Sequence, residues 1–185
     1  MANTLTAIRL VLALPVMVGF ARPGVLPPWI VALLLALAVA SDYLDGPLAR
    51  RSGTASPRGM LFDHATDCLF VTGGLAGAAA AGLLTPILPA LIPFAFSQYV
   101  VDSYVWSRRR QLRASFLGRW NGVLYFVPLV LIAAGQVSAP SSWLSAFLLQ
   151  AAGVLGYVLS ISTVTSMIDR ATTPSSAGRE QPRPG

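Results

Sequence analysis

The chain has 185 residues, of which 55% are hydrophobic and only 11% are charged, and its formal net charge is +6. A soluble domain usually carries about 25% charged residues, so this composition excludes an ordinary water-exposed surface and indicates lipid as the solvent. It also excludes a nucleic-acid-binding protein, because so apolar a chain offers little polar surface to a duplex. The single cysteine, Cys68, excludes an intrachain disulfide.

The predicted elements are six apolar segments separated by turn residues. A membrane-spanning helix needs about 20 mostly apolar residues, and each segment approaches or reaches that length. We therefore predict an all-α, polytopic membrane protein with six transmembrane helices within residues 1–170, followed by a disordered tail over residues 171–185. In chain order, the segments are residues 5–21, 28–40, 60–84, 87–106, 120–134 and 143–168.

The arginines predict which side of the membrane each connection faces. They concentrate after the second segment, around residues 108–119, and after the sixth segment. Six spans place these three regions and the N-terminus on one side, and of the arginines in the connections Arg22 alone lies opposite. Because basic connections stay in the cytoplasm, we expect both termini at the cytoplasmic face.

Four of the seven acidic residues lie close together, at the expected cytoplasmic ends of the second and third segments. Charged side chains at membrane depth are costly and usually functional. Asp42 and Asp45 are three residues apart and Asp63 and Asp67 are four apart, so each pair shares one face of a helix. Crowded carboxylates repel unless cations lie between them, and carboxylate oxygens suit Mg²⁺ or Mn²⁺. The pattern therefore predicts a site for two divalent ions, an arrangement that recurs in phosphoryl transfer.

Small residues accompany the aspartates. Gly46 and Ala49 lie at the end of the second segment, and Gly59 lies at the start of the third. They keep the helix ends narrow, so that a flat base or a phosphate can approach the backbone. Arg50 would then contact a diphosphate.

These residues form one string, Asp42-x2-Asp45-Gly46-x2-Ala49-Arg50, eight residues, Gly59-x3-Asp63-x3-Asp67. The string resembles the signature of the CDP-alcohol phosphotransferases, which make phospholipids such as phosphatidylglycerophosphate, phosphatidylserine and phosphatidylinositol. All eight signature positions match with the correct spacing. The start of the chain, Asn3-x-Leu5-Thr6-x2-Arg9, is similar to the first helix of many members. The resemblance covers residues 1–168.

The resemblance implies a role for each signature residue. The four aspartates, Asp42, Asp45, Asp63 and Asp67, would hold two Mg²⁺ or Mn²⁺ ions on the donor's diphosphate, and Asp67 would also act as the general base on the acceptor hydroxyl. The hydroxyl would attack the phosphorus distal to cytidine, and CMP would leave. The resemblance also implies donor contacts from Asn3 and Thr6 and a CDP-binding pocket formed by Asp42, Gly46, Ala49, Arg50, Gly59 and Asp63.

The acceptor is predicted from the family as a whole. The first choice is transfer of a phosphatidyl group from CDP-diacylglycerol to glycerol 3-phosphate, with inositol, inositol phosphate, serine or phosphatidylglycerol as alternatives. Relatives with phosphorylated acceptors bind them through basic residues after the fourth segment. We therefore expect Arg113 and Arg119 to contact the acceptor, with Asp102 as a further candidate that would otherwise pair with a nearby arginine. The alternative for Arg113 and Arg119, and the more typical role of the run at residues 108–110, is an anchor on anionic lipid.

Two neighbours of the aspartates favour other acceptors. His64 makes the site similar to the cholinephosphotransferase and ethanolaminephosphotransferase branch, in which a soluble CDP-alcohol reacts with diacylglycerol. As a side chain, we interpret His64 as a satisfied polar residue rather than a metal ligand. Cys68 stands where many relatives carry Lys or Arg, which argues against glycerol 3-phosphate, and we interpret it as a small packing residue.

Two other classes of protein compete with the enzyme. A small cation transporter would explain the intramembrane carboxylates but not the spacing of glycine, alanine and arginine around them. A non-catalytic assembly protein would leave the costly acidic cluster unexplained. We therefore favour an enzyme of the bacterial plasma membrane, with its active site in the cytoplasm and the CDP-linked donor, a small alcohol and membrane lipid as partners. Relatives are often homodimers, and residues 73–77 are small enough for close packing against a second copy.

Overall fold

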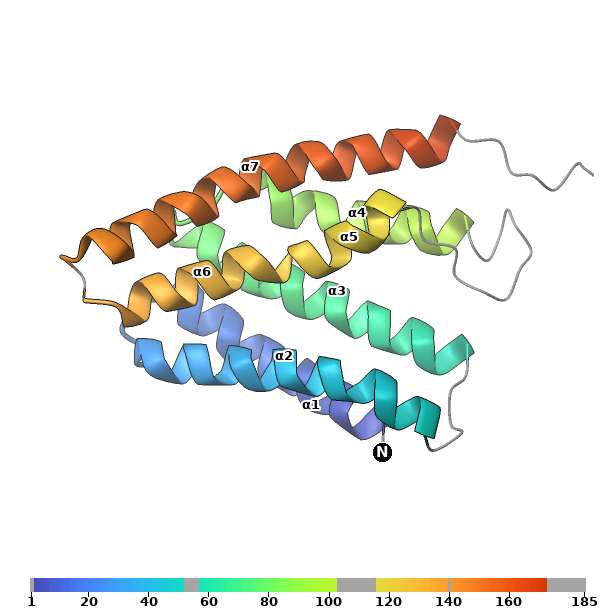
Figure 1. Ribbon diagram of the computed structural model, residues 1–185, viewed down its shortest axis with the longest axis horizontal. Coiled ribbons are helices and arrows are strands. Elements are labelled where there is room, and N and C mark those ends of the chain that lie inside the picture. Colours follow the sequence, from blue (N-terminus) through green and yellow to red (C-terminus); the bar gives the residue numbers. More distant parts are fainter. Residues whose placement is uncertain (1, 52–56, 103–115, 140, 173–185) are drawn as a thin grey trace, which may run out of the picture.

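The computed structural model describes residues 2–51, 57–102, 116–139 and 141–172 (Figure 1). Within these ranges, the side chains of residues 2–5, 42, 44–51, 57–58 and 116–117 lie outside the description. The described residues form helices and contain no strand. The helices are α1 (Ala2–Ala21), α2 (Pro28–Arg51), α3 (Pro57–Ala80), α4 (Ile87–Val101), α5 (Phe116–Leu124), α6 (Phe126–Val137) and α7 (Trp143–Thr172).

The all-α prediction is confirmed for the described residues. Six helical rods correspond to the six predicted segments, because α5 and α6 follow each other with one break at Tyr125 and form a single apolar stretch, Gly118–Val137. That stretch and Trp143–Thr172 are long and apolar enough to cross a membrane. Shorter apolar stretches lie in α1, α2 and α4, at Thr6–Ala21, Pro28–Ser41 and Ile87–Val101.

Proline and glycine set several helix ends. Pro28 and Pro57 are the first residues of α2 and α3, where the missing N–H of proline costs nothing. The third predicted segment extends to residue 84, but α3 ends at Ala80. Gly82 there has a φ of +74°, a conformation that stops the helix, and the Leu83 N–H donates to the Ala78 carbonyl oxygen at 3.0 Å.

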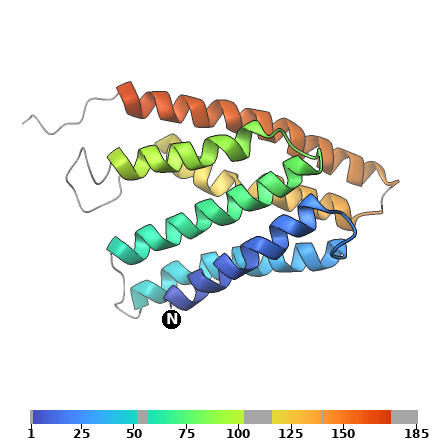
Figure 2. The same cartoon turned by 180° about the vertical axis from the view of Figure 1, so that it is seen from behind.

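The helices form an up-and-down bundle (Figures 1 and 2). α1 packs on α2 and α3, α4 packs on α3 and α7, and α6 packs on α2, α3 and α7. The start of α1, the facing ends of α2 and α3, and the end of α7 all lie at one end of the bundle (Figure 1). That end is the one that the arginine distribution assigns to the cytoplasm.

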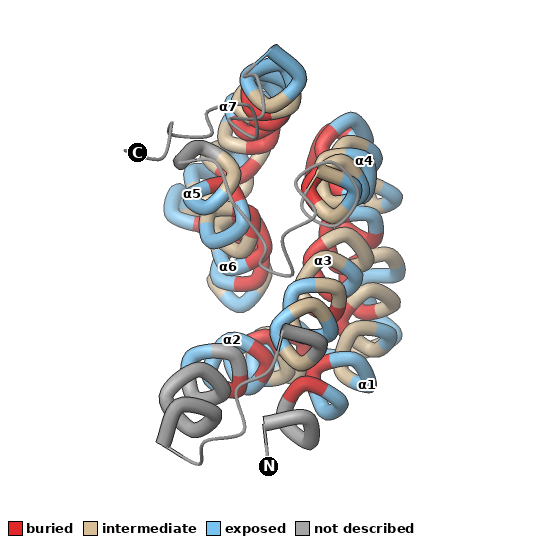
Figure 3. The backbone as a smooth tube through the Cα atoms, turned by 90° about the vertical axis from the view of Figure 1, so that its right-hand side faces the viewer, coloured by how far each residue is buried: buried red, intermediate tan, exposed pale blue. Residues whose placement is uncertain are grey.

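Two glycines of α3 let neighbouring helices approach closely. A Cβ at Gly77 would collide with the carbonyl oxygen of Met17 in α1, and a Cβ at Gly74 would lie 3.0 Å from a methyl of Leu129 in α6. Both glycines are buried, and the buried residues of the bundle, red in Figure 3, lie where the helices face one another. Gly74 and Gly77 therefore serve packing within the chain, and pairing with a second copy through this stretch stays a prediction.

Candidate active site

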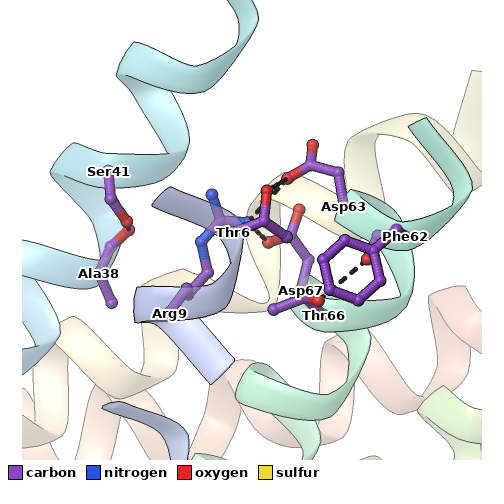
Figure 4. A network of polar contacts seen from close by, with 8 residues as sticks. All are labelled: Thr6, Arg9, Ala38, Ser41, Phe62, Asp63, Thr66 and Asp67. Carbon is purple, nitrogen blue, oxygen red and sulfur yellow. Dashed lines mark hydrogen bonds and ion pairs between the residues drawn. The ribbon is translucent and has the colours of Figure 1, made fainter. Parts of the chain in front are cut away.

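A buried cation joins the two aspartates of α3. Arg9 of α1 has no exposed side-chain surface, and its Nη1 donates to Asp63 Oδ1 at 3.3 Å and forms an ion pair with Asp67 Oδ1 (Figure 4). Thr6 Oγ1 donates to the same oxygen of Asp63 at 3.4 Å. The side chains of Asp63 and Asp67 are 27% and 26% exposed. The cluster thus has a dry side formed by α1 and an open side formed by the carboxylates.

Helical spacing explains why these four side chains meet. Thr6 and Arg9 are three residues apart on α1, and Asp63 and Asp67 are four apart on α3, so each pair lies on one face of its helix. α1 and α3 pack side by side and run in the same direction (Figure 2). The close approach at Gly77 holds their backbones near each other. The two polar faces therefore oppose each other at the end of the bundle.

A cavity of about 670 Å³ opens beside Asp67. Helices α2 to α7 all contribute to its lining, and most of the lining surface is apolar. Of the signature aspartates whose side chains are described, Asp67 lines the cavity and Asp63 does not. The described lining residues with polar or ionisable side chains are Tyr43, His64, Asp67, Cys68, Tyr99, Arg119, Tyr125 and Arg170.

Three of these side chains form a stack in the cavity wall. The rings of His64 in α3 and Tyr99 in α4 lie nearly parallel, with centroids 6.5 Å apart and planes 15° apart. The guanidinium of Arg170 in α7 lies over the Tyr99 ring. Its Cζ is 5.0 Å from the ring centroid, which is within the range of a cation–π attraction. Asp102 adds an electrostatic attraction for Arg170. These contacts hold a guanidinium at the wall of the cavity.

A second arginine borders the same space. Arg119 of α5 is exposed and lines the cavity, together with the neighbouring Gly118. Among the described lining residues, one carboxylate, Asp67, and two guanidinium groups, Arg119 and Arg170, lie in an otherwise largely apolar surface. Such a space can receive an anionic molecule that also has an apolar or neutral part.

The signature residues of the sequence fall in the facing ends of α2 and α3. Tyr43 of α2 lines the cavity together with Asp67, so this part of α2 borders the same space. Gly59 is half-buried in the first turn of α3. The remaining signature residues are helical, but their side chains lie outside the description: Asp42, Asp45, Gly46, Ala49 and Arg50.

The predicted donor and acceptor residues outside the signature are only partly within the described chain. Arg119 lines the cavity, whereas Arg113 and the side chain of Asn3 lie outside the described residues. Asp102 is half-buried at the end of α4, where its negative charge attracts Arg170. It is not among the described residues that line the cavity. Thr6 is buried, and its hydroxyl contacts Asp63.

His64 and Cys68 both line the cavity. His64 is exposed and stacks on Tyr99, so its ring is part of the wall. Cys68 is half-buried, with its Sγ 4.0 Å from the Thr72 hydroxyl. In the described part of the chain, no three His, Cys, Asp or Glu side chains gather at one point.

The sequence assigned no role to three residues of this site. For Arg9 the sequence did contain an indication of a functional position, since a charged residue inside an apolar helix is usually functional and Arg9 lies three residues after Thr6. For Tyr99 and Arg170 the sequence contained no such indication, because they lie on different helices and meet only where α4 packs on α7.

The described carboxylates fit a divalent cation. Asp63 and Asp67 both direct an oxygen at one positive group, the Arg9 guanidinium, and both remain reachable from the open side. Oxygen donors of this kind suit Mg²⁺ or Mn²⁺. The pair supplies half of the predicted set of four carboxylates.

The sequence profile of the CDP-alcohol phosphatidyltransferase family matches residues 1–163 of the chain. The match therefore includes α1 to α6 and most of α7. It covers Arg9, Asp67, Tyr99 and Arg119, but it ends before Arg170.

Curated relatives give partial matches. The chain is 32% identical over 149 residues to the CDP-diacylglycerol–glycerol-3-phosphate 3-phosphatidyltransferase of Mycoplasma genitalium, covering 70% of this chain and 62% of the relative. It is 34% identical over 109 residues to the cardiolipin synthase (CMP-forming) of Streptomyces coelicolor, covering 56% of this chain and 50% of the relative. It is 36% identical over 105 residues to an uncharacterised CDP-alcohol phosphatidyltransferase class-I family protein of Dictyostelium discoideum, covering 49% and 26%. The chain thus spans less than two thirds of the length of each of these relatives.

Proposed function

This chain belongs to the CDP-alcohol phosphatidyltransferase family, and we propose that it is a membrane enzyme that transfers a phosphatidyl group from CDP-diacylglycerol to glycerol 3-phosphate and releases CMP. The M. genitalium relative carries this donor and this acceptor in its name. The observation that carries the proposal is the shared cavity of Asp67, Arg119 and Arg170, which combines a carboxylate with two guanidinium groups beside an apolar wall.

The proposed location is a membrane crossed six times, with α5 and α6 forming one crossing. Large apolar side chains are exposed on the outer faces of several helices, among them Val11, Phe94, Trp143 and Ile161. Water-soluble proteins seldom expose apolar surface on this scale. The end of the bundle where α2 and α7 end would face the cytoplasm, since the last residues of α2 are Arg50 and Arg51 and Arg170 lies in the last turn of α7.

The proposed acceptor site uses both arginines of the cavity. A guanidinium binds phosphate with paired, charge-assisted hydrogen bonds. Arg170 is restrained by Tyr99, so it would lose little freedom when it binds the phosphate of glycerol 3-phosphate. The hydroxyl end of the same molecule would then lie toward Asp67, which lines the same cavity.

The proposed donor site lies at the facing ends of α2 and α3. Two Mg²⁺ or Mn²⁺ ions, when bound there, would neutralise the diphosphate and the charge that develops on the attacking and leaving oxygens. We assign their binding to Asp42, Asp45, Asp63 and Asp67. We assign the surrounding contacts with cytidine diphosphate to Gly46, Ala49, Arg50 and Gly59, with Asn3 as a further donor contact, whereas the predicted donor contact Thr6 is buried and holds Asp63 instead.

The chemistry then follows from the position of Asp67. Its carboxylate would accept the proton of the acceptor hydroxyl as the hydroxyl oxygen attacks the phosphatidyl phosphorus. The bond from that phosphorus to the CMP oxygen breaks, and CMP leaves with the bonding electrons. The apolar part of the cavity would limit water near the phosphorus, which favours transfer over hydrolysis.

An acceptor panel tests this proposal. The purified full chain in detergent, with CDP-diacylglycerol and Mn²⁺, should release CMP with glycerol 3-phosphate at least about tenfold faster than with inositol, inositol phosphate or serine. Preference for phosphatidylglycerol would assign the reaction named for the S. coelicolor relative instead. CMP release only from CDP-choline with diacylglycerol would assign the other branch. Absence of CMP release with every pair would overturn the proposal.

A further inference from the structure

α1 closes one side of the aspartate pair with a buried arginine, and we propose that Arg9 is a positioning residue that acts as a built-in counter-ion of the metal site. It holds Asp63 and Asp67 together before a divalent ion arrives, and its charge weakens the binding of that ion. The inference rests on the proposed metal-dependent function, and it adds a residue that lies outside the aspartate signature.

The contacts of Arg9 place its charge between the two carboxylates. A single nitrogen, Nη1, contacts one oxygen of Asp63 and one oxygen of Asp67 (Figure 4). The side chain is fully buried, so this charge is not shared with bulk water. Thr6, one turn earlier on α1, holds the Asp63 oxygen from the same side. α1 thus contacts the aspartate pair through both Thr6 and Arg9.

The open side of the cluster remains accessible to a ligand. Asp63 and Asp67 are about one quarter exposed, whereas Arg9 approaches them from the protein interior. Asp67 also lines the cavity. An arginine in this position can restrain the carboxylates while leaving their outer oxygens free to face a metal ion and substrate. A buried guanidinium costs more than an apolar side chain would on this helix, so a role in the site explains its presence better than packing alone.

The charge of Arg9 should have opposite effects in the two states of the site. Without a divalent ion, it offsets the repulsion between the carboxylates and stabilises the fold. With an ion, it is a like charge close to that ion and reduces the affinity. Even at the dielectric constant of water, a unit charge about 5 Å from a divalent ion changes its affinity by roughly tenfold.

Removing the charge separates this role from an ordinary structural one. We expect Arg9→Gln to lower the unfolding temperature of the full chain in EDTA and to tighten Mn²⁺ binding by about tenfold, measured by isothermal titration calorimetry. Arg22→Gln is the matched control, because Arg22 is exposed in the connection between α1 and α2, and it should change neither value. A side chain that only supported packing would weaken Mn²⁺ binding when removed.

Unchanged or weaker Mn²⁺ binding by Arg9→Gln would overturn the inference. Arg9→Lys provides a second test that does not depend on the folding of the first variant, because it keeps the charge and should bind Mn²⁺ within about threefold of the unmodified chain. A tenfold gain in that variant would show that charge is not the cause and would also overturn the inference. If the unmodified chain did not bind Mn²⁺, the proposed metal site would be overturned as well. If the unmodified chain released CMP but Arg9→Gln bound Mn²⁺ with the same affinity as the unmodified chain, only this inference would be overturned.

Discussion

Replacing Asp67 with asparagine removes one negative charge while leaving the size and shape of the side chain almost unchanged. Asp67 lines the cavity and pairs with buried Arg9, so the substitution should affect turnover and stability separately. Loss of a positioned general base costs about 10²–10⁴-fold in rate, and this residue would also be a metal ligand. We therefore expect Asp67→Asn to lower kcat by about 10³-fold or more.

The effect on stability should be much smaller. Arg9 keeps its contact with Asp63, and the amide oxygen of asparagine can still accept a hydrogen bond from it. A charge-assisted hydrogen bond contributes about 1.5–3 kcal/mol, and this one is partly screened because Asp67 is 26% exposed. A loss of about 1 kcal/mol corresponds to a fall in Tm of about 2–4 °C for a chain of this size.

The assay is CMP release from CDP-diacylglycerol with glycerol 3-phosphate, paired with thermal unfolding of the same preparation. Glu180→Gln is the matched control for the loss of one negative charge, since Glu180 follows the last residue of α7 in the sequence and lies outside residues 1–163, which match the family. It should keep the activity of the unmodified chain. CMP release by Asp67→Asn within about tenfold of that activity would refute the role of Asp67. A far larger fall in Tm would refute the estimate of its contact with Arg9.

Three further predictions follow from the cavity, the metal site and the packing. Arg119→Gln and Arg170→Gln should each raise the KM for glycerol 3-phosphate by about tenfold with a smaller change in kcat, and unchanged KM values in both would contradict the acceptor site. EDTA should abolish CMP release and excess Mg²⁺ or Mn²⁺ should restore it, so activity that survives complete chelation would exclude the metal mechanism. Gly77→Ala should lower the free energy of unfolding by about 1–3 kcal/mol, because the added methyl would press on the Met17 carbonyl oxygen. Gly153→Ala is the control and should not lower it, because a methyl there would meet no other part of the chain within 4 Å. Equal unfolding temperatures for the two variants would contradict the close packing of α1 on α3.

The arrangement of helices follows closely from the sequence because apolar length is a local property. Each of the six apolar segments corresponds to one helical rod. The errors lie at the ends. α2 continues through the polar signature to Arg51, beyond the apolar run, since polar residues can remain helical after the apolar stretch ends. α3 stops before the apolar run does, because Gly82 adopts a left-handed conformation that hydropathy does not report.

The site is predictable only where its residues share a helix. The four-residue spacing of Asp63 and Asp67 predicts that both face the same way, and the structure shows both against one guanidinium. The partner itself could not be predicted, because Arg9 lies more than 50 residues away and reaches the pair only through the packing of α1 on α3. The stack of Tyr99 and Arg170 depends in the same way on the packing of α4 on α7.

The one-sided burial of the cluster explains how a charged site can work inside an apolar bundle. If Asp63 and Asp67 were enclosed on every side, neither a metal ion nor an acceptor could reach them. If both were fully exposed, no contact would fix their orientation. Arg9 provides a buried cation from the dry side, while the side chains of Asp63 and Asp67 stay about one quarter exposed. The energetic cost of burying the guanidinium is therefore tied to a preorganised pair of oxygen donors, which Arg9 contacts because α1 packs directly on α3.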